Sequence, residues 1–317
     1  MKRLAVLGTL VWDRIHRHPG RPPHEGWGGI AYSLAALGSA LPDPWQIVPL
    51  VRVGRDLRGP AEALFASLPK LAPDGAPVWV SHPNNRVELR YHDPEHRCER
   101  LTGGVGPWTR PELLPRLVGA HALYVNFISG ADVTLHALEG ARRVFRGPIY
   151  ADLHSLLLSL GRDGRRSLRP LPEWRRWLAC CDAVQVNEEE LATLAGGGDL
   201  ERFSACLLSA GPGWLFVTRG SGGAEWWRRR GVRAEPTRWE ETRGGAAGAA
   251  VRGRLLAEPV ADADPTGCGD VWGATLFARL LARDGIHAAG RVASRAAAGN
   301  ARRSGVEALA ESLAAIR

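Results

Sequence analysis

The chain contains almost no lysine. Of its 41 basic residues only Lys2 and Lys70 are lysines, and the remaining 39 are arginines. A Walker A loop requires a lysine in G-x-x-x-x-G-K-[ST], and protein kinases require one on a strand over the phosphates. Neither lysine has such a neighbourhood, so both classes are excluded. Any phosphate site in this chain must rely on backbone N–H groups, a metal ion or arginine.

Disulfide frameworks, zinc clusters and membrane spans also lack sequence support. The cysteines are odd in number and form no C-x-x-C pair; they are Cys98, Cys180, Cys181, Cys206 and Cys268. We therefore expect a protein of the reducing cytoplasm. No stretch approaches the ~18 consecutive apolar residues of a membrane span. The apolar run 4–12 ends at Asp13 and predicts a buried first strand rather than a targeting signal.

The charge balance is basic, with a formal net charge of +8 and a pI near 9.8. A basic surface attracts nucleic acid when its charges gather in one stripe. Here the arginines are spread along the whole chain. We therefore expect no nucleic-acid partner.

Apolar strands alternate with helical segments along most of the chain. The predicted strands are 4–11, 48–53, 122–127, 148–152, 183–186 and 214–218, and the predicted helices are 30–41, 60–71, 133–145, 171–179, 188–194, 200–209 and 269–283. A glycine-rich excursion covers 228–253. This alternation predicts a doubly wound, mostly parallel sheet flanked by helices, in a single α/β domain over residues 1–317. Ligands of such sheets bind at the carboxyl ends of the strands.

One region departs from this rhythm. Val87, Leu89 and Tyr91 alternate with polar residues, a period of two that is typical of an antiparallel ribbon with one solvent-exposed face. We therefore predict a small β lid, formed by segments at about 13–27 and 76–104.

The segment D-P-T-G-C-G-D, from Asp264 to Asp270, carries the strongest chemical signal. Gly267 and Gly269 allow a sharp turn, and the apolar pattern that follows predicts a buried helix. The N–H groups of Gly267, Cys268 and Gly269 would then form an anion hole at a positive helix start. Asp270, in the first turn, is a candidate general base beside that hole, although a capping carboxylate in a tight glycine turn would look the same.

Two weaker motifs follow predicted strands. Thr218, Gly220 and Gly223 form T-x-G-x-x-G, where backbone can approach a nucleotide closely. Asn187 and Glu190 form N-x-x-E at a helix start, which suits hydrogen bonding through water to hydrated magnesium. Any glycine turn could give the first motif, and an ordinary N-cap could give the second.

In this order the three motifs resemble those of the ribokinase-like (PfkB) carbohydrate kinases. The likeness covers nearly the whole chain. It also includes Leu7-Gly8 before Asp13, Gly28-Gly29 with the helix after it, the trio Gly54, Asp56 and Gly59, and Ala296 to Asn300 followed by Gly305.

The resemblance implies phosphoryl transfer from ATP, with magnesium, to a hydroxyl of a sugar or sugar-like molecule. Asp270 would take the proton, and the Gly267 to Gly269 amides would stabilise the phosphoryl charge. It also implies that Asn300 borders the adenine pocket. The residues implied for the acceptor are Asp13, Gly28, Gly29, Ser33 and Asn126. Those implied for potassium are Asp264, Thr266 and Ser304, and the lid strands would pair across a homodimer.

Three departures from the family pattern leave the acceptor open. Ser33 stands where an asparagine is usual, Cys268 where alanine is usual, and His154 and Ser155 follow a strand after which an arginine is usual. One alternative is a nucleoside kinase of the same fold, which a more aromatic lid than Tyr91 and Trp79 would favour. Another is a catalytically silent binding or regulatory member, which has no need of Asp270. A dinucleotide oxidoreductase is disfavoured, because no G-x-G-x-x-G follows the first strand.

Overall fold

The structure is a computed structural model that describes residues 1–16, 22–91, 97–243, 250–261 and 263–315. An eight-stranded main sheet has the order β16-β15-β14-β13-β10-β9-β1-β4. Its strands are β1 (Lys2–Leu7), β4 (Trp45–Leu50), β9 (Ala122–Asn126), β10 (Ile149–Asp152), β13 (Ala183–Asn187), β14 (Trp214–Thr218), β15 (Ala224–Arg229) and β16 (Ala250–Leu255). All neighbours from β4 to β14 are parallel, and β15 and β16 are antiparallel. The predicted mostly parallel sheet is confirmed.

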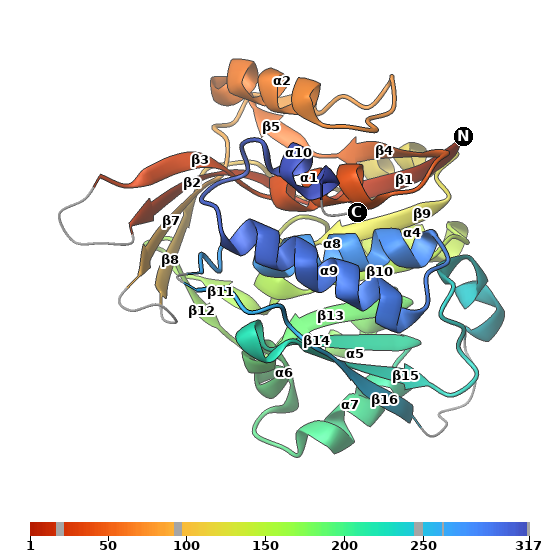
Figure 1. Cartoon of the computed structure of the whole chain (residues 1–317). Coiled ribbons are helices and arrows are strands. Elements are labelled where there is room, and N and C mark those ends of the chain that lie inside the picture. The colour runs from red at the N-terminus through yellow and green to blue at the C-terminus, as the bar shows by residue number, and fades with distance from the viewer. Residues whose placement is uncertain (17–21, 92–96, 244–249, 262, 316–317) are drawn as a thin grey trace.

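Helices cover both faces of this sheet, as expected for strands that are apolar on both sides. In Figure 1, α8, α9 and α1 lie in front of the sheet. This layer contains α1 (Ile30–Ala40), α8 (Cys268–Leu281), α9 (Ile286–Ala301) and α10 (Leu309–Ala314). The opposite layer contains α4 (Leu135–Val144), α5 (Trp174–Ala179), α6 (Glu188–Ala195) and α7 (Leu200–Ser209).

Alternate strand residues supply the two cores. Tyr124, Tyr150 and Phe216 point toward α8, where the rings of Tyr150 and Phe277 lie 5.2 Å apart. Their neighbours in sequence, such as Leu123, pack on the other helical layer. This alternation fixes the register of each strand, because a slip by one residue would exchange the two cores.

A second, six-stranded sheet projects from one end of the main sheet (Figure 1). It contains strands from both predicted lid segments, so we call it the lid sheet. Its order is β11-β12-β8-β7-β2-β3, and only β2 and β7 are parallel. The strands are β2 (Leu10–His16), β3 (His24–Gly29), β7 (Arg86–Tyr91), β8 (Arg97–Thr102), β11 (Leu158–Leu160) and β12 (Arg165–Leu168). Both predicted lid segments contribute strands, and the hairpin β11–β12 extends the sheet beyond them.

The remaining elements lie at the margins. The strands β5 (Arg52–Gly54) and β6 (Val78–Val80) form a separate parallel pair. The helices are α2 (Arg58–Ser67) and α3 (Arg110–Leu113), and the 3-10 turns are η1 (Arg55–Leu57), η2 (Leu114–Leu117), η3 (His154–Leu157), η4 (Gly220–Gly222) and η5 (Pro236–Thr242). Trp79 therefore belongs to this pair and not to the lid sheet.

Two predicted boundaries were wrong. The single first strand 4–11 is divided at Gly8, so Asp13 lies within lid strand β2 and not at the end of β1. Apolar periodicity cannot show where a chain passes from one sheet to another. The excursion 228–253 includes the end of β15 and the start of β16, where Gly253 lies under the Trp226 ring. Glycine suits this strand because a Cβ atom would contact the indole at 2.5 Å.

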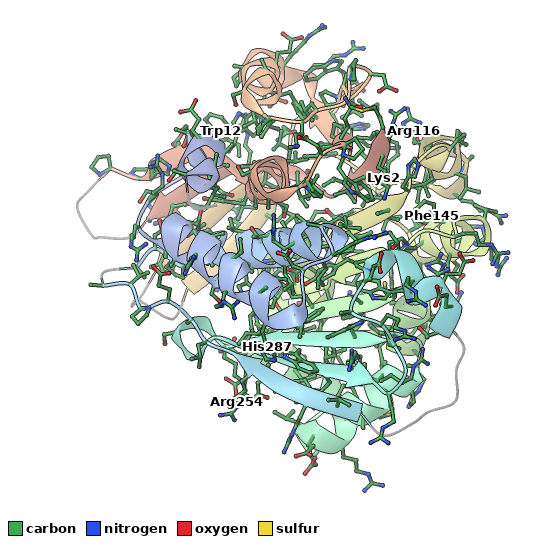
Figure 2. All side chains as sticks on the ribbon, turned by 45° about the vertical axis from the view of Figure 1, so that its right-hand side comes forward. Lys2, Trp12, Arg116, Phe145, Arg254 and His287 are labelled. Carbon is green, nitrogen blue, oxygen red and sulfur yellow. The ribbon has the colours of Figure 1, made fainter. Side chains whose placement is uncertain are left out.

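None of the helices in the described residues has both the length and the hydropathy of a membrane span. Basic side chains lie on different sides of the molecule, as Arg116 and Arg254 show in Figure 2.

Candidate active site

The turn 264–270 delivers backbone amides to the start of α8. Gly267 is the N-cap, with a left-handed φ of 74°, and a Cβ atom there would press on the Tyr32 ring. The Cys268 amide donates to the Pro265 carbonyl at 3.2 Å, whereas those of Gly267 and Gly269 donate to no acceptor within the described ranges. Two amides of the predicted anion hole therefore face outward from a positive helix end.

Asp270 lies in the first turn of α8, and a side chain of the main sheet holds its carboxylate in place. Asn126, the last residue of β9, donates through Nδ2 to Asp270 Oδ1 at 2.6 Å and to Ser33 Oγ at 3.0 Å. Asn126 is fully buried, and its Oδ1 has no hydrogen-bond partner among the described residues. The Asp270 carboxylate is thus oriented by an amide that packing holds in place.

The residues predicted for the acceptor lie where the lid meets the main sheet. Asp13 is buried in β2, and a Cβ atom at Gly28 would collide with its carboxylate. Gly29, with φ 60°, joins β3 to α1. Burial raises the pKa of Tyr32 above its usual range, and the charges of Asp13 and Asp270 raise it further. The carboxylates of Asp13 and Asp270 therefore both lie near the Tyr32 side chain.

A cavity of about 370 Å³ lies beside the turn. One part of its wall is apolar and is contributed by the segment after β16 and by α9, including Pro259, Val260, Ala263, Ala297, Ala298 and Ala301. The other part is polar and contains the predicted donor-site residues Asn187, Glu190, Thr218, Gly220 and Gly223. The residues Gly267 to Asp270 also line it. The cavity can thus receive a molecule with one apolar and one anionic end.

Asn300 does not line this cavity. It lies in the last turn of α9, is 2% exposed, and donates to the Thr266 carbonyl at 2.8 Å. Its position therefore stabilises the turn from behind, while the alanines beside it form the apolar wall. The structure also brings the potassium candidates together: Asp264 accepts from the Thr266 amide at 2.9 Å and from Ser304 Oγ at 3.2 Å.

Residues 162–313 match the model of the pfkB family carbohydrate kinases. This stretch contains the turn, Asp270 and the donor-site residues. This part of the chain is therefore similar to the PfkB carbohydrate kinases. A comparison with curated proteins found no match.

Solved ribokinase-like structures share the fold of this chain at low identity. A pyrophosphate-dependent kinase in the ribokinase family, solved as a sulfate complex, is 15% identical, with a TM-score of 0.73 and 99% of each chain covered. Arabidopsis thaliana ribokinase, complexed with ribose and ATP, is 17% identical, with a TM-score of 0.70, and 100% of this chain and 99% of that chain are covered. Ribokinase from Thermotoga maritima is 15% identical, with a TM-score of 0.69, and 100% of this chain and 99% of that chain are covered.

Sequence reasoning missed the support beneath the turn. Gln185 of β13 donates to Asp152 Oδ2 at 2.7 Å and to the Gly269 carbonyl at 3.1 Å, and accepts from Tyr150 Oη at 2.8 Å. This side chain joins β10, β13 and α8. Burial raises the pKa of Asp152 well above its usual value, and the charges of Glu190 and Asp270 raise it further. A lone glutamine inside a strand carries no local signal of this role.

Asn187 and Glu190 begin α6 with a reciprocal capping box. The Glu190 amide donates to Asn187 Oδ1, and the Asn187 amide donates to Glu190 Oε2, both at 2.8 Å. Glu190 Oε1 also lies 3.1 Å from His154 Nδ1. Burial opposes the charge on His154, but Glu190, Asp270 and Asp152 outweigh it and raise the pKa to about 9. Glu190 is therefore both a capping residue and a cavity residue.

The lid contacts the turn directly. Tyr91 Oη of β7 lies 3.1 Å from Thr266 Oγ1. The lid also contains the aromatic pair Trp12 and Trp27, whose rings meet edge to face at 5.1 Å. Trp27 ends the predicted lid segment 13–27, whereas Trp12 lies outside both predicted segments.

Proposed function

We propose that this protein is a kinase of the PfkB type that transfers the γ-phosphoryl group of ATP to a hydroxyl of a sugar or sugar-like molecule, with Asp270 as the general base. One observation carries the proposal: a cavity with an apolar and a polar part is lined by Asp270 and by Gly267 and Gly269, whose amides face outward. Asn126 donates to both Asp270 and Ser33, and the buried Asp13 lies in lid strand β2.

In the proposed reaction the acceptor hydroxyl oxygen forms a bond to the γ-phosphorus as the bond to the bridging oxygen of ADP breaks. The hydroxyl proton passes to the Asp270 carboxylate, whose orientation Asn126 fixes. The Gly267 and Gly269 amides donate to the developing charge on the phosphoryl oxygens. Positioning and electrostatics supply most of the rate enhancement.

The apolar wall supports a nucleotide as donor. Val260 and the alanines of α9 offer a surface on which a planar base can lie, and Thr218, Gly220 and Gly223 offer polar contacts toward the phosphates. Pyrophosphate, the donor named for one structural neighbour, would leave this apolar surface uncovered.

Magnesium fits the carboxylate and amide oxygens at the polar end, because it prefers oxygen ligands and keeps several waters. No group of three residues that could hold a metal ion directly occurs within the described residues. Glu190 and Asn187 would hold the hydrated ion through water, and the ion would neutralise phosphate charge. Potassium at Asp264, Thr266 and Ser304, and a homodimer through the lid, stay predictions.

A nucleoside acceptor is the second candidate. The pair Trp12 and Trp27, with Tyr91, makes the lid sheet more aromatic than the sequence alone indicated. Aromatic rings stack on nucleobases. A phosphoryl-transfer panel of pentoses, hexoses, phosphosugars and nucleosides, each offered with ATP and with pyrophosphate, tests donor and acceptor together.

Asp270→Asn tests the mechanism. Asparagine can still accept the Asn126 hydrogen bond, so we expect a loss of stability of at most ~1 kcal/mol and unchanged ATP affinity. Turnover should fall ~10²- to 10⁴-fold, the contribution of a positioned base. Asp284→Asn, which removes the carboxylate paired with Arg279 near the other end of α8, is the control and should retain turnover. Near-normal turnover of the Asp270 variant would refute the mechanism.

A further inference from the structure

The wall of the donor cavity is rich in carboxylates. Asp152, Glu190, Glu258 and Asp270 all line it. Glu258 is compensated from outside by Arg302, whose Nη2 lies 3.1 Å from it. The other three carboxylates lie at the polar end, where the donor phosphates would enter. A polyphosphate placed there meets like charge, so cations are needed for it to bind.

The chain itself supplies few such cations. Of the lining residues that the structure describes, His154 alone has a side chain that can carry positive charge. The arginine that follows β14, Arg219, is outside the lining and lies 3.5 Å from both Glu188 and Glu225. The scarcity of lysine thus extends to the site itself, and one imidazole occupies the place where a lysine or arginine could be expected.

The position of His154 is fixed by the sheet. It is the second residue after β10, and the backbone on each side is anchored. The Leu153 amide donates to the Gln185 carbonyl at 3.0 Å, and the Ser155 amide donates to the Phe127 carbonyl at 2.9 Å. Its Nδ1 lies 3.1 Å from Glu190 Oε1, and 32% of the side chain is exposed. A carboxylate can only accept, so Nδ1 donates to Glu190, and Nε2 is the ring nitrogen left to the cavity, where the imidazolium form donates.

We propose that His154 binds the donor, with Nε2 donating a hydrogen bond to a terminal phosphate while Glu190 holds Nδ1. The inference rests on the proposed function, in which the donor phosphates occupy the polar end of this cavity. An imidazolium whose Nδ1 is held by a carboxylate donates a charge-assisted hydrogen bond through Nε2, the stronger class for phosphate oxygens. His154 therefore takes the part that lysine or arginine plays in other phosphate sites.

Calorimetric titration of the full-length protein tests this proposal without turnover. The ligands are ATP, adenosine and pyrophosphate, each measured with magnesium and with EDTA. His154→Ala should weaken ATP binding about tenfold or more, the effect of one charge-assisted hydrogen bond, and should leave adenosine binding unchanged. The loss should persist in EDTA, because His154 acts on the phosphate itself. His154→Arg should recover part of the affinity for ATP.

The control is His287→Ala, which removes an imidazole that meets the Trp226 ring edge to face at 6.2 Å. It should bind all three ligands normally. Melting curves identify any variant that fails to fold, in which case His154→Gln, which keeps a neutral donor, replaces it and should show a smaller loss.

Several outcomes would overturn the proposal: unchanged ATP affinity, equal losses for ATP and adenosine, or a loss that disappears in EDTA. The last would mean that His154 acts only by positioning Glu190 for the metal. If the natural protein binds pyrophosphate but not ATP, the nucleotide donor is wrong, and the effect of His154→Ala on pyrophosphate then decides the role of His154. If it binds neither, both proposals fail.

Discussion

Replacement of Gln185 by leucine is expected to lower the free energy of unfolding by about 3 kcal/mol. The side chain is 2% exposed and makes three hydrogen bonds, to Asp152, Tyr150 and the Gly269 carbonyl. Each buried hydrogen bond contributes about 1 kcal/mol net, and leucine satisfies none of the three partners. The turn that carries the proposed anion-binding amides also loses its contact with β13, so the proposed phosphoryl transfer should slow as well.

The chain provides a matched control, because its only other glutamine is Gln46 in β4 of the same sheet. Gln46→Leu should change stability by less than about 1 kcal/mol. Urea denaturation followed by circular dichroism gives both values, provided that the slope with denaturant stays the same in all three proteins. If Gln185→Leu is no more destabilising than Gln46→Leu, the network does not hold the turn as argued.

A glutamate at position 185 should make the stability of the folded protein depend on pH. Gln185→Glu keeps the size of the side chain and places a second carboxyl group beside Asp152. Burial, Glu190 and Asp270 already raise the pKa of Asp152, and the new group should raise it further. Because a raised folded-state pKa means that stability is lost as pH rises, this variant should approach the natural protein at acidic pH and fall well below it at alkaline pH. A pH-independent difference would contradict this reasoning.

Two further predictions concern the cavity and the lid. Glu190→Gln removes the negative charge that stabilises the protonated form of His154, so NMR titration should show the pKa of His154 falling from about 9. The magnesium concentration that turnover requires should also rise. An unchanged magnesium titration would mean that Glu190 is a capping residue only. Glu99→Gln leaves Arg166, whose side chain is 2% exposed, without its counter-charge at 2.6 Å, and should cost about 3 kcal/mol of stability in urea denaturation. The double variant Glu99→Leu, Arg166→Met should recover much of that loss, since apolar replacement of a buried pair is often neutral.

Local sequence rules predicted the backbone structure of the candidate site. The turn around Gly267 requires a left-handed φ, and the apolar pattern after Asp270 requires a buried helix, so seven consecutive residues specify a helix start that can bind an anion. The parallel sheet was predictable for the same reason, because each strand is apolar on both faces and is followed by a helix. Asn187 and Glu190 were found as a pair because a capping box has a fixed spacing.

The supporting residues could not be found in this way, because their partners are distant in the chain. Gln185 contacts Gly269, 84 positions away, and Asn126 contacts Asp270, 144 positions away. Neither spacing follows from any local rule. Asn126 was placed at the acceptor by resemblance alone, and its hydrogen bond to Asp270 appears only once β9 and α8 are packed.

The division of the first strand has a similar cause and a chemical consequence. Residues 4–11 are uniformly apolar, but β1 ends at Leu7 and β2 begins at Leu10. The break transfers the chain from the main sheet to the lid, so Asp13 is carried by the lid sheet while Asp270 is carried by a helix on the main sheet. Tyr91 and Thr266 link the same two bodies through their hydroxyl groups. A displacement of the lid sheet would therefore separate Asp13, the proposed acceptor residue, from Asp270, the proposed base. We expect phosphoryl transfer to water to be slow until a bound acceptor holds the lid sheet in place, because the open site is not assembled for the reaction.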